Sequence, residues 1–152
     1  MSITLSSTAF AAGASIPDVY SCKGRSVSPP LTWSDPPSGT KAFTLIMDDP
    51  DAPIGTFVHW VIYNLPASAR GLPEAVPANE KLADGTQQGN NGAGRVGYTG
   101  PCPPSGTHRY FFKLYALDTT LSLSSGAGKD QLLQAMQGHI LAQGELMGKF
   151  SK

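Results

Sequence analysis

Lys41-Ala42-Phe43-Thr44-Leu45-Ile46-Met47 is a stretch with apolar side chains on both faces, and it ends at the acidic pair Asp48-Asp49. Its length and bulky side chains predict a buried strand. Phe57 to Leu65 and Arg109 to Leu117 have the same character, and each is rich in aromatic residues. Strands that are apolar on both faces must be covered on both faces, as the inner strands of a packed sheet or sandwich are. These stretches therefore predict a mostly β protein.

The composition predicts one loop-rich domain. A chain of 152 residues has room for a single core, so we expect one domain over residues 1–152. Charged residues make up 14%, while 17 Gly and 13 Pro favour strands and loops over a helical bundle. Lys plus Arg and Asp plus Glu both number 11, so the basic surface that nucleic-acid binding requires is absent. Nucleic acid is therefore not an expected partner.

The N-terminal and cysteine patterns predict a cytoplasmic protein. No apolar run has the length of a membrane span, so we expect no membrane insertion. The first basic residue is Lys23, so the basic start of a signal peptide is missing. Cys22 and Cys102 lie outside any CxxC or zinc pattern, which favours two reduced thiols in a reducing compartment. A disulfide that closes the long segment between them stays open as the alternative.

Two further stretches predict how the rest of the chain is organised. Gly71 to Pro101 is dense in Gly, Asn and Gln and too long for a hairpin turn, so we expect either an ordered functional loop or a wrapped excursion over the surface. Asp130 can cap a late helix, with Gly138 and Gly144 packed closely against the sheet or another chain. The residues near one face of that helix are Leu132, Leu133, Met136, Ile140, Leu141 and Met147.

Two histidines beside strand-forming residues indicate a small polar pocket. Asp49 ends one strand, His59 lies in the next, and His108 opens a third after a Gly/Pro-rich loop. Tyr110 is two residues after His108 and so projects to the same face. The alternative for Asp49 is a turn former, and for His59 and Tyr110 it is core packing.

Six further residues are candidates for structural roles. Asp51 reads as a turn former that Arg109 can neutralise. Trp33 and Phe57 fit either a pocket mouth or the core, and core packing is favoured for Trp60. The third histidine, His139, reads as a surface or packing residue on the late helix.

The chain resembles the phosphatidylethanolamine-binding protein family, which includes the Raf kinase inhibitory proteins, and more closely its bacterial and archaeal branch. The resemblance rests on Ser28-Pro29-Pro30-Leu31-Thr32-Trp33, Asp49-Pro50-Asp51-Ala52-Pro53, His59-Trp60-Val61-Ile62-Tyr63-Asn64-Leu65-Pro66, Gly100-Pro101-Cys102-Pro103-Pro104-Ser105-Gly106-Thr107-His108-Arg109-Tyr110 and Gly138-His139-Ile140-Leu141-Ala142. With the strand pattern it implies a Greek-key-like β-sandwich that has a central antiparallel-rich sheet, one or two peripheral helices and a long ordered loop.

The resemblance also implies a site without metal or cofactor that binds phosphate, a phospho-headgroup or a carboxylate. The expected ligand-binding residues are Asp49, His59, His108, Tyr110, Pro53, Gly100, Cys102 and Pro103. The family further implies regulation of kinases or proteases, a homodimer, and a cis peptide bond at Ala52-Pro53. The bacterial branch has a shorter step between the Pro-Pro pair and the histidine, as in Pro103-Pro104 and His108 here, so the resemblance also implies a more open pocket.

Two other functions stay open on the residues alone. Asp49, His59 and His108 together have the donor set of a non-haem iron or zinc enzyme, and Ser105 with His108 and Asp49 has the residue types of a hydrolase triad. A protein-inhibitor scaffold that acts through its loops is the other alternative.

Overall fold

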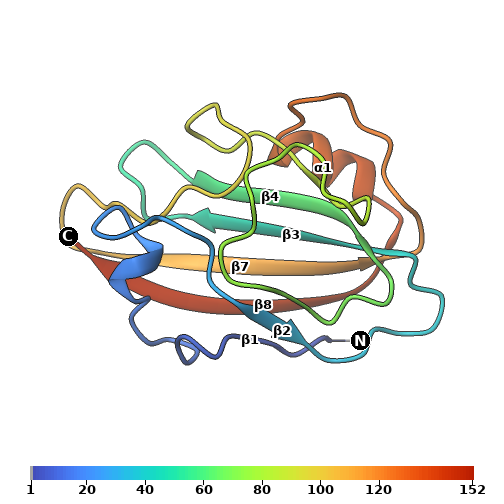
Figure 1. The fold of residues 1–152 in the computed structure, drawn as a ribbon, viewed down its shortest axis with the longest axis horizontal. Helices are drawn as coiled ribbons and strands as arrows, with labels where there is room; N and C mark the ends of the chain where they lie inside the picture. The colour runs from blue at the N-terminus through green and yellow to red at the C-terminus, as the bar shows by residue number, and fades with distance from the viewer. Residues whose placement is uncertain (1) are drawn as a thin grey trace.

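The stretch Lys41-Met47 lies at the centre of a five-stranded antiparallel sheet in the order β6-β4-β3-β7-β8 (Figure 1). The computed structural model describes residues 2–152. The strands of this sheet are β3 (Ala42–Asp49), β4 (Phe57–Pro66), β6 (Gln87–Gln88), β7 (Thr107–Leu117) and β8 (Ile140–Ser151). All residues of β3 are buried, which confirms a strand covered on both faces.

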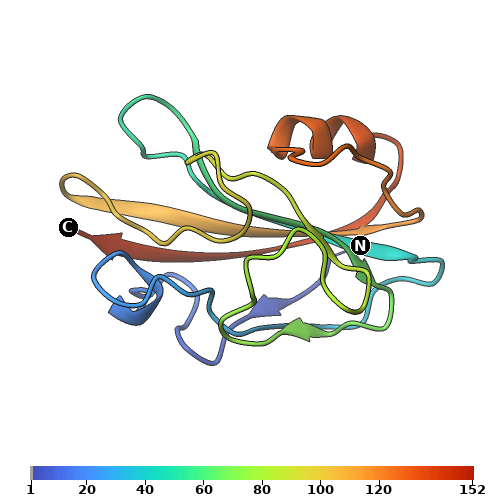
Figure 2. The ribbon, with the colours of Figure 1, turned by 45° about the horizontal axis from the view of Figure 1, so that its top comes forward.

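A second sheet and a helix cover the two faces. The second sheet has the order β1-β2-β5, built from β1 (Leu5–Ser6), β2 (Leu31–Trp33) and β5 (Gly71–Leu72), and a short 3-10 helix, η1 (Asp18–Tyr20), precedes β2. Figure 2 shows this sheet on one side of the large sheet and α1 (Lys129–Met136) on the other. The main core, which includes Phe43, Trp60 and Phe112, lies between the sheets, and Ile46 packs with Leu132 of α1 on the opposite face. The predicted sandwich is confirmed, with Trp60 in its core.

The late helix is shorter than its sequence pattern predicts. It ends at Met136, Gly138 adopts the left-handed φ of 80° that closes many helices, and the chain continues as β8. In β8, Ala142, Leu146 and Phe150 are buried among more exposed neighbours, which is the period of a strand. Helical spacing of Leu141 and Met147 was therefore misleading. Within residues 2–152, no helix is both long enough and apolar enough to cross a membrane.

The close packing predicted for Gly144 is present, and its partner is the N-terminal segment. A Cβ atom at Gly144 would collide with the backbone carbonyl of Ile3. Ile3 donates its N–H to the carbonyl of Gln143 at 2.8 Å, and Ile16 donates to Lys149 at 2.7 Å. Residues near the N-terminus thus cover the outer edge of β8, which otherwise would leave unpaired backbone groups.

The long segment from Gly71 to Pro101 is an excursion along β4, as predicted. It holds β5 and β6, and Gln88 joins it to the core by accepting a 2.7 Å hydrogen bond from Trp60 Nε1. The amide of Gln88 also donates to the carbonyls of Pro77 and Asn79 at 2.7 and 2.9 Å. These bonds hold the excursion in place.

Two predictions about covalent geometry are wrong. Cys22 and Cys102 form a disulfide with an S–S distance of 2.05 Å, because folding brings their Cα atoms to 5.4 Å across a sequence separation of 80. No cis peptide bond is present in residues 2–152, so Ala52-Pro53 is trans. Asp49 Oδ1 accepts the N–H of Asp51 at 2.8 Å and Gly55 has a φ of 112°, which together turn the chain without a cis bond.

Candidate functional site

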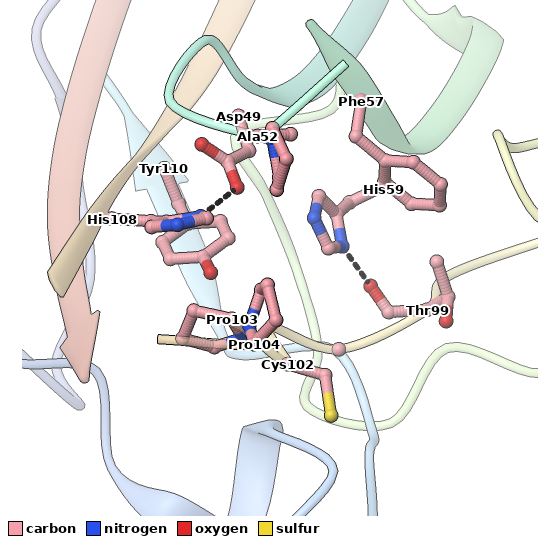
Figure 3. A pocket seen from close by; sticks show the side chains of 12 residues that line it. Asp49, Ala52, Phe57, His59, Thr99, Cys102, Pro103, Pro104, His108 and Tyr110 are labelled. Carbon is pink, nitrogen blue, oxygen red and sulfur yellow. Dashed lines mark hydrogen bonds and ion pairs between the residues drawn. The ribbon is translucent and has the colours of Figure 1, made fainter. Parts of the chain in front are cut away.

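The C-terminal end of β3 and the N-terminal ends of β4 and β7 lie at the same end of the large sheet, because neighbouring strands run antiparallel. A cavity of about 220 Å³ opens there (Figure 3). Its lining residues are Asp49, Ala52, Pro53, Phe57, His59, Thr99, Gly100, Cys102, Pro103, Pro104, His108 and Tyr110. The structure thus brings all eight sequence-predicted site residues together.

Asp49 and His108 form a buried pair within this cavity. His108 Nδ1 lies 2.7 Å from Asp49 Oδ2, and the residues are only 7% and 2% exposed. An ionised carboxylate only accepts, so Nδ1 carries the proton and Nε2 of His108 is left for other partners. The other oxygen of Asp49 holds the turn at Asp51. Asp49 is therefore both a turn former and a pocket residue.

His59 is oriented by a backbone carbonyl. Its Nδ1 lies 2.7 Å from the carbonyl oxygen of Thr99, which can only accept, so Nδ1 donates and Nε2 is the free nitrogen. Figure 3 shows that free nitrogen on the side facing Asp49 and His108. Burial lowers the pKa of His59, while the Thr99 carbonyl and the Asp49 carboxylate act in the opposite direction. At neutral pH, His59 therefore presents an uncharged acceptor to the cavity.

Tyr110 lies between the two histidines. Its ring meets the His59 ring edge-on at 5.2 Å and is nearly parallel to the His108 ring at 6.4 Å, so it shares the face of His108 as predicted. The Tyr110 hydroxyl is buried and has no hydrogen-bond partner within residues 2–152. It points toward the side of the cavity formed by Pro103 and Pro104 (Figure 3). Burial raises its pKa, so the hydroxyl keeps its proton and remains a donor.

Asp51 and Arg109 stand outside the cavity and brace its loop. Arg109 Nη2 lies 2.8 Å from Asp51 Oδ1, and both the backbone N–H and Nε of Arg109 donate to Asp51 Oδ2 at 2.9 Å. The hydrogen bonds from Arg109 lower the pKa of Asp51 to about 2. The structural roles predicted for Arg109 and Asp51 agree with this geometry.

Thr99 is the functional position that sequence reasoning missed. It acts through its backbone carbonyl, and any residue type supplies that group, so no side-chain signal marks it. Phe57 lines the cavity and packs edge-on against His59 at 4.8 Å, whereas Trp33 lies in the core. His139 precedes β8 and pairs with Asp118 at 2.7 Å, away from the cavity lining.

The alternative catalytic groupings are not assembled. Ser105 is exposed in the bend before β7 and is not among the residues that line the cavity. Across residues 2–152, no three His, Cys, Asp or Glu side chains are grouped so that they can share a metal ion. The Nδ1 atoms of both pocket histidines already have protein partners.

Comparisons with known proteins agree with this fold. The family model described as phosphatidylethanolamine-binding protein matches residues 6–151. A UPF0098 protein of Methanothermobacter thermautotrophicus is 52% identical over 137 residues, which cover 90% of this chain and 91% of the relative. A UPF0098 protein of Aquifex aeolicus is 50% identical over 149 residues, covering 96% and 86%.

Two solved structures have the same fold. A Chlamydia trachomatis protein described as a phosphatidylethanolamine-binding protein homolog superposes with a TM-score of 0.91 at 45% identity, covering 99% of this chain and 98% of that one. Escherichia coli YbcL, described as a member of the mammalian family, has a TM-score of 0.91 at 30% identity, covering 100% and 99%. Because the family model matches almost the whole length of this chain, the chain belongs to the phosphatidylethanolamine-binding protein family.

Proposed function

We propose that the cavity binds a small anionic group: phosphate, the phosphate of a headgroup, or a carboxylate. The observation that carries the proposal is the convergence of His59, His108 and the unpartnered Tyr110 hydroxyl on one cavity of about 220 Å³. A phenol hydroxyl and a protonated imidazole Nε2 donate hydrogen bonds to oxyanions, and an uncharged Nε2 accepts one from a ligand that still carries a proton. The apolar walls exclude competing water. Membership of the family supports a ligand-binding protein of this type.

The protonation states of the cavity side chains determine which protonation state of the anion binds best. Both oxygens of Asp49 already have partners, since one faces His108 Nδ1 and the other faces the Asp51 N–H. Neutral His59 offers an acceptor, so a ligand that still carries a proton, such as a monoprotonated phosphate, donates to it. Tyr110 donates to the same ligand. When an imidazole takes up a proton it adds attraction for the anion, so affinity rises as the pH falls.

Titration of the protein with inorganic phosphate tests the proposal. His108→Gln removes the imidazole, and His139→Gln is the matched control because His139 lies outside the cavity lining. We expect His108→Gln to weaken binding at least tenfold, the loss of about one charge-assisted hydrogen bond. His139→Gln is expected to bind as the natural protein does. Equal affinity of all three proteins would contradict the site.

The pH dependence is measured with two anions. Sulfate keeps its charge near neutral pH whereas phosphate titrates, so a rise of sulfate affinity between pH 8 and pH 6 isolates the histidines. His59 has a lowered pKa, so its contribution continues below pH 6.5. A flat sulfate profile would show that the histidines do not take up a proton on binding.

Regulation of a kinase or protease is the proposed consequence of ligand binding. The rim residues beside the cavity, including Ala52 and Pro53, are open to a partner. Capture of a defined kinase or protease by the natural protein, and loss of that capture with His108→Gln, is the expected result. Capture that is unaffected by the substitution would instead support a scaffold acting through its loops.

The Asp49–His108 pair favours an enzyme as the second candidate. A carboxylate that orients a histidine through Nδ1 is the arrangement of a general base, which leaves Nε2 to activate water. Hydrolysis of p-nitrophenyl phosphate or p-nitrophenyl acetate that disappears in His108→Gln would support this function. Activity retained by that variant would exclude His108 as the base.

A homodimer is the proposed assembly. In the part of the chain that the structure describes, the large hydrophobic residues with exposed side chains are Ile54, Leu133 and Ile140. Ile54 follows the cavity residue Pro53, so an interface that includes it would leave the cavity open nearby. Light scattering at micromolar concentration is expected to give twice the mass of the chain, and the mass of one chain would overturn the dimer.

The proposed location of the protein is the cytoplasm. The Cys22–Cys102 disulfide, in place of the two reduced thiols expected from the sequence, is more typical of an oxidising compartment, with intracellular proteins of hyperthermophiles as the exception. Fractionation of cells with antibody detection locates the protein directly.

A further inference from the structure

One wall of the cavity is formed by the segment 99–104, and β4 holds its inner side. Thr99 donates its N–H to the His59 carbonyl at 2.9 Å, and His59 returns a bond from Nδ1 to the Thr99 carbonyl at 2.7 Å. A displacement of this segment therefore moves the acceptor that orients His59. Gly100, Cys102, Pro103 and Pro104 complete the wall.

The outer side of the same wall is held by the segment 20–26. The Cys22–Cys102 disulfide joins the two segments, and Cys22 donates its N–H to the Pro101 carbonyl at 3.1 Å. Gly100 donates to Ser26 Oγ at 2.9 Å, and any side chain at Gly100 would collide with the Tyr20 carbonyl and Ser26. The two segments are thus pressed together, with one covalent link and a few hydrogen bonds between them.

The disulfide lies in the wall of the cavity, but its sulfur atoms do not occupy the space between the histidines. Cys102 lines the cavity, yet its sulfur is directed away from the histidines (Figure 3). Cys22 and Cys102 are both exposed residues, so a dissolved thiol has access to this part of the surface. Accessible disulfides are reduced more readily than those enclosed in a core.

We propose that this disulfide is a redox control of anion binding in the cavity; the inference rests on the anion-binding function proposed above. A dithiol supplies two electrons and two protons: the S–S bond breaks to give two thiols, and the dithiol becomes a disulfide. Reduction leaves the wall held by hydrogen bonds alone, so the arrangement that orients His59 is occupied for less of the time. Affinity falls in proportion to that occupancy.

The test compares inorganic phosphate binding by the oxidised protein and by protein reduced with dithiothreitol, which carries no charge that would compete for the cavity. We expect the dissociation constant to rise about tenfold on reduction, which corresponds to a wall ordered in about one-tenth of the molecules. The double variant Cys22→Ser/Cys102→Ser is expected to bind as weakly as the reduced protein and to be insensitive to dithiothreitol.

A matched control separates a local effect from a general loss of stability. Leu132→Ala makes a hole in the core beneath α1, on the opposite face of the large sheet, and leaves the disulfide intact. We expect it to bind phosphate within about twofold of the natural protein, since the cavity wall is unchanged. A loss as large as that caused by reduction would overturn the proposal.

A second readout does not depend on phosphate. Amide hydrogen exchange at Thr99 and Cys22 is expected to be at least tenfold faster after reduction, because both amides bond across the affected wall. Unchanged exchange, or equal phosphate affinity of the oxidised and reduced proteins, overturns the redox control and leaves the anion site standing. Absence of phosphate binding to the oxidised protein, before any reductant is added, overturns both proposals.

Discussion

At the scale of single residues, one carboxylate does two tasks. Asp49 accepts from His108 with one oxygen and from the Asp51 backbone with the other. A buried imidazole N–H that loses its acceptor carries a desolvation cost, whereas an exposed pair loses little. Asp118 and His139 form such an exposed pair, with side chains 42% and 45% exposed.

Asp49→Ala is therefore expected to lower the free energy of unfolding by about 1–3 kcal/mol, because His108 Nδ1 is left buried without a partner. Asp49→Asn keeps an acceptor at the same place and is expected to lose less. Asp118→Ala is the control, with an expected loss of about 0–1 kcal/mol. Urea denaturation at pH 7.5 measures all three, and equal losses at positions 49 and 118 would contradict the burial argument.

His59 makes stability depend on pH in a defined direction. Burial lowers its pKa below the ordinary 6.5, so the folded protein favours the neutral ring. The stabilisation is complete above pH 6.5 and is lost as the pH falls from 6.5 through the lowered folded pKa. We expect the urea midpoint of the natural protein to fall between pH 6.5 and pH 5, and His59→Gln to reduce that fall.

Asp51 acts in a separate, more acidic interval. Its pKa is lowered from 3.8 to about 2, so its contribution is present above about pH 4 and is lost as the pH falls toward 2. Arg109→Gln is expected to reduce the pH dependence only in that interval. A change between pH 6.5 and pH 5 in this variant would mean that the two effects are not independent.

At the scale of secondary structure, the C-terminal region shows how one pattern fits two elements. Leu132, Met136 and Ile140 recur as on a helix, but Gly138 stops the helix and the residues that follow alternate as a strand. The sheet then decides the outcome, because β8 pairs with β7 from Ile140 to Ser151. Gly144 is the position at which this strand meets the N-terminal segment.

Gly144→Ala tests that contact. The added Cβ meets the Ile3 backbone carbonyl, which cannot rotate away as a flexible side chain would, so we expect a loss of about 1–3 kcal/mol in the free energy of unfolding. Glu145→Ala, an exposed position in the same strand, is the control and is expected to change stability by less than about 0.5 kcal/mol. Thermal denaturation compares the two variants. If Gly144→Ala leaves the stability unchanged, the N-terminal segment that holds Ile3 moves to accommodate the added Cβ.

At the scale of the whole molecule, the disulfide joins the N-terminal part of the chain to the entry of β7. It closes a loop with a sequence separation of 80, and loop-closure entropy in the unfolded chain grows with that separation. The closed loop contains β2 and β5 of the second sheet, strands β3 and β4 of the large sheet, and the long excursion. The bond is therefore a stabiliser of the entire fold as well as a tether of the cavity wall.

Cys22→Ser/Cys102→Ser is expected to lower the free energy of unfolding by about 4.5 kcal/mol, the chain-entropy value for a loop of this size. Chemical denaturation of the variant and of the natural protein, with and without dithiothreitol, measures the difference. If reduction of the natural protein lowers the free energy of unfolding by much less than this value, the unfolded chain already keeps these segments close together.

The sequence by itself determined three of the four long strands of the large sheet, β3, β4 and β7, and eight of the twelve residues that line the cavity. Burial on both faces follows from an unbroken apolar run, and alternation placed His108 and Tyr110 on one face, because these are local consequences of strand geometry. The ordered motifs also identified the family, which the matched family model confirms.

Tertiary structure alone decided the features that join distant positions. The Cys22–Cys102 bond, the Thr99 carbonyl behind His59 and the Ile3 carbonyl against Gly144 each depend on segments that are far apart in sequence. Local pattern is set by the periodicity of the backbone, whereas these contacts are set by how complete strands pack, and no short stretch of sequence carries that information.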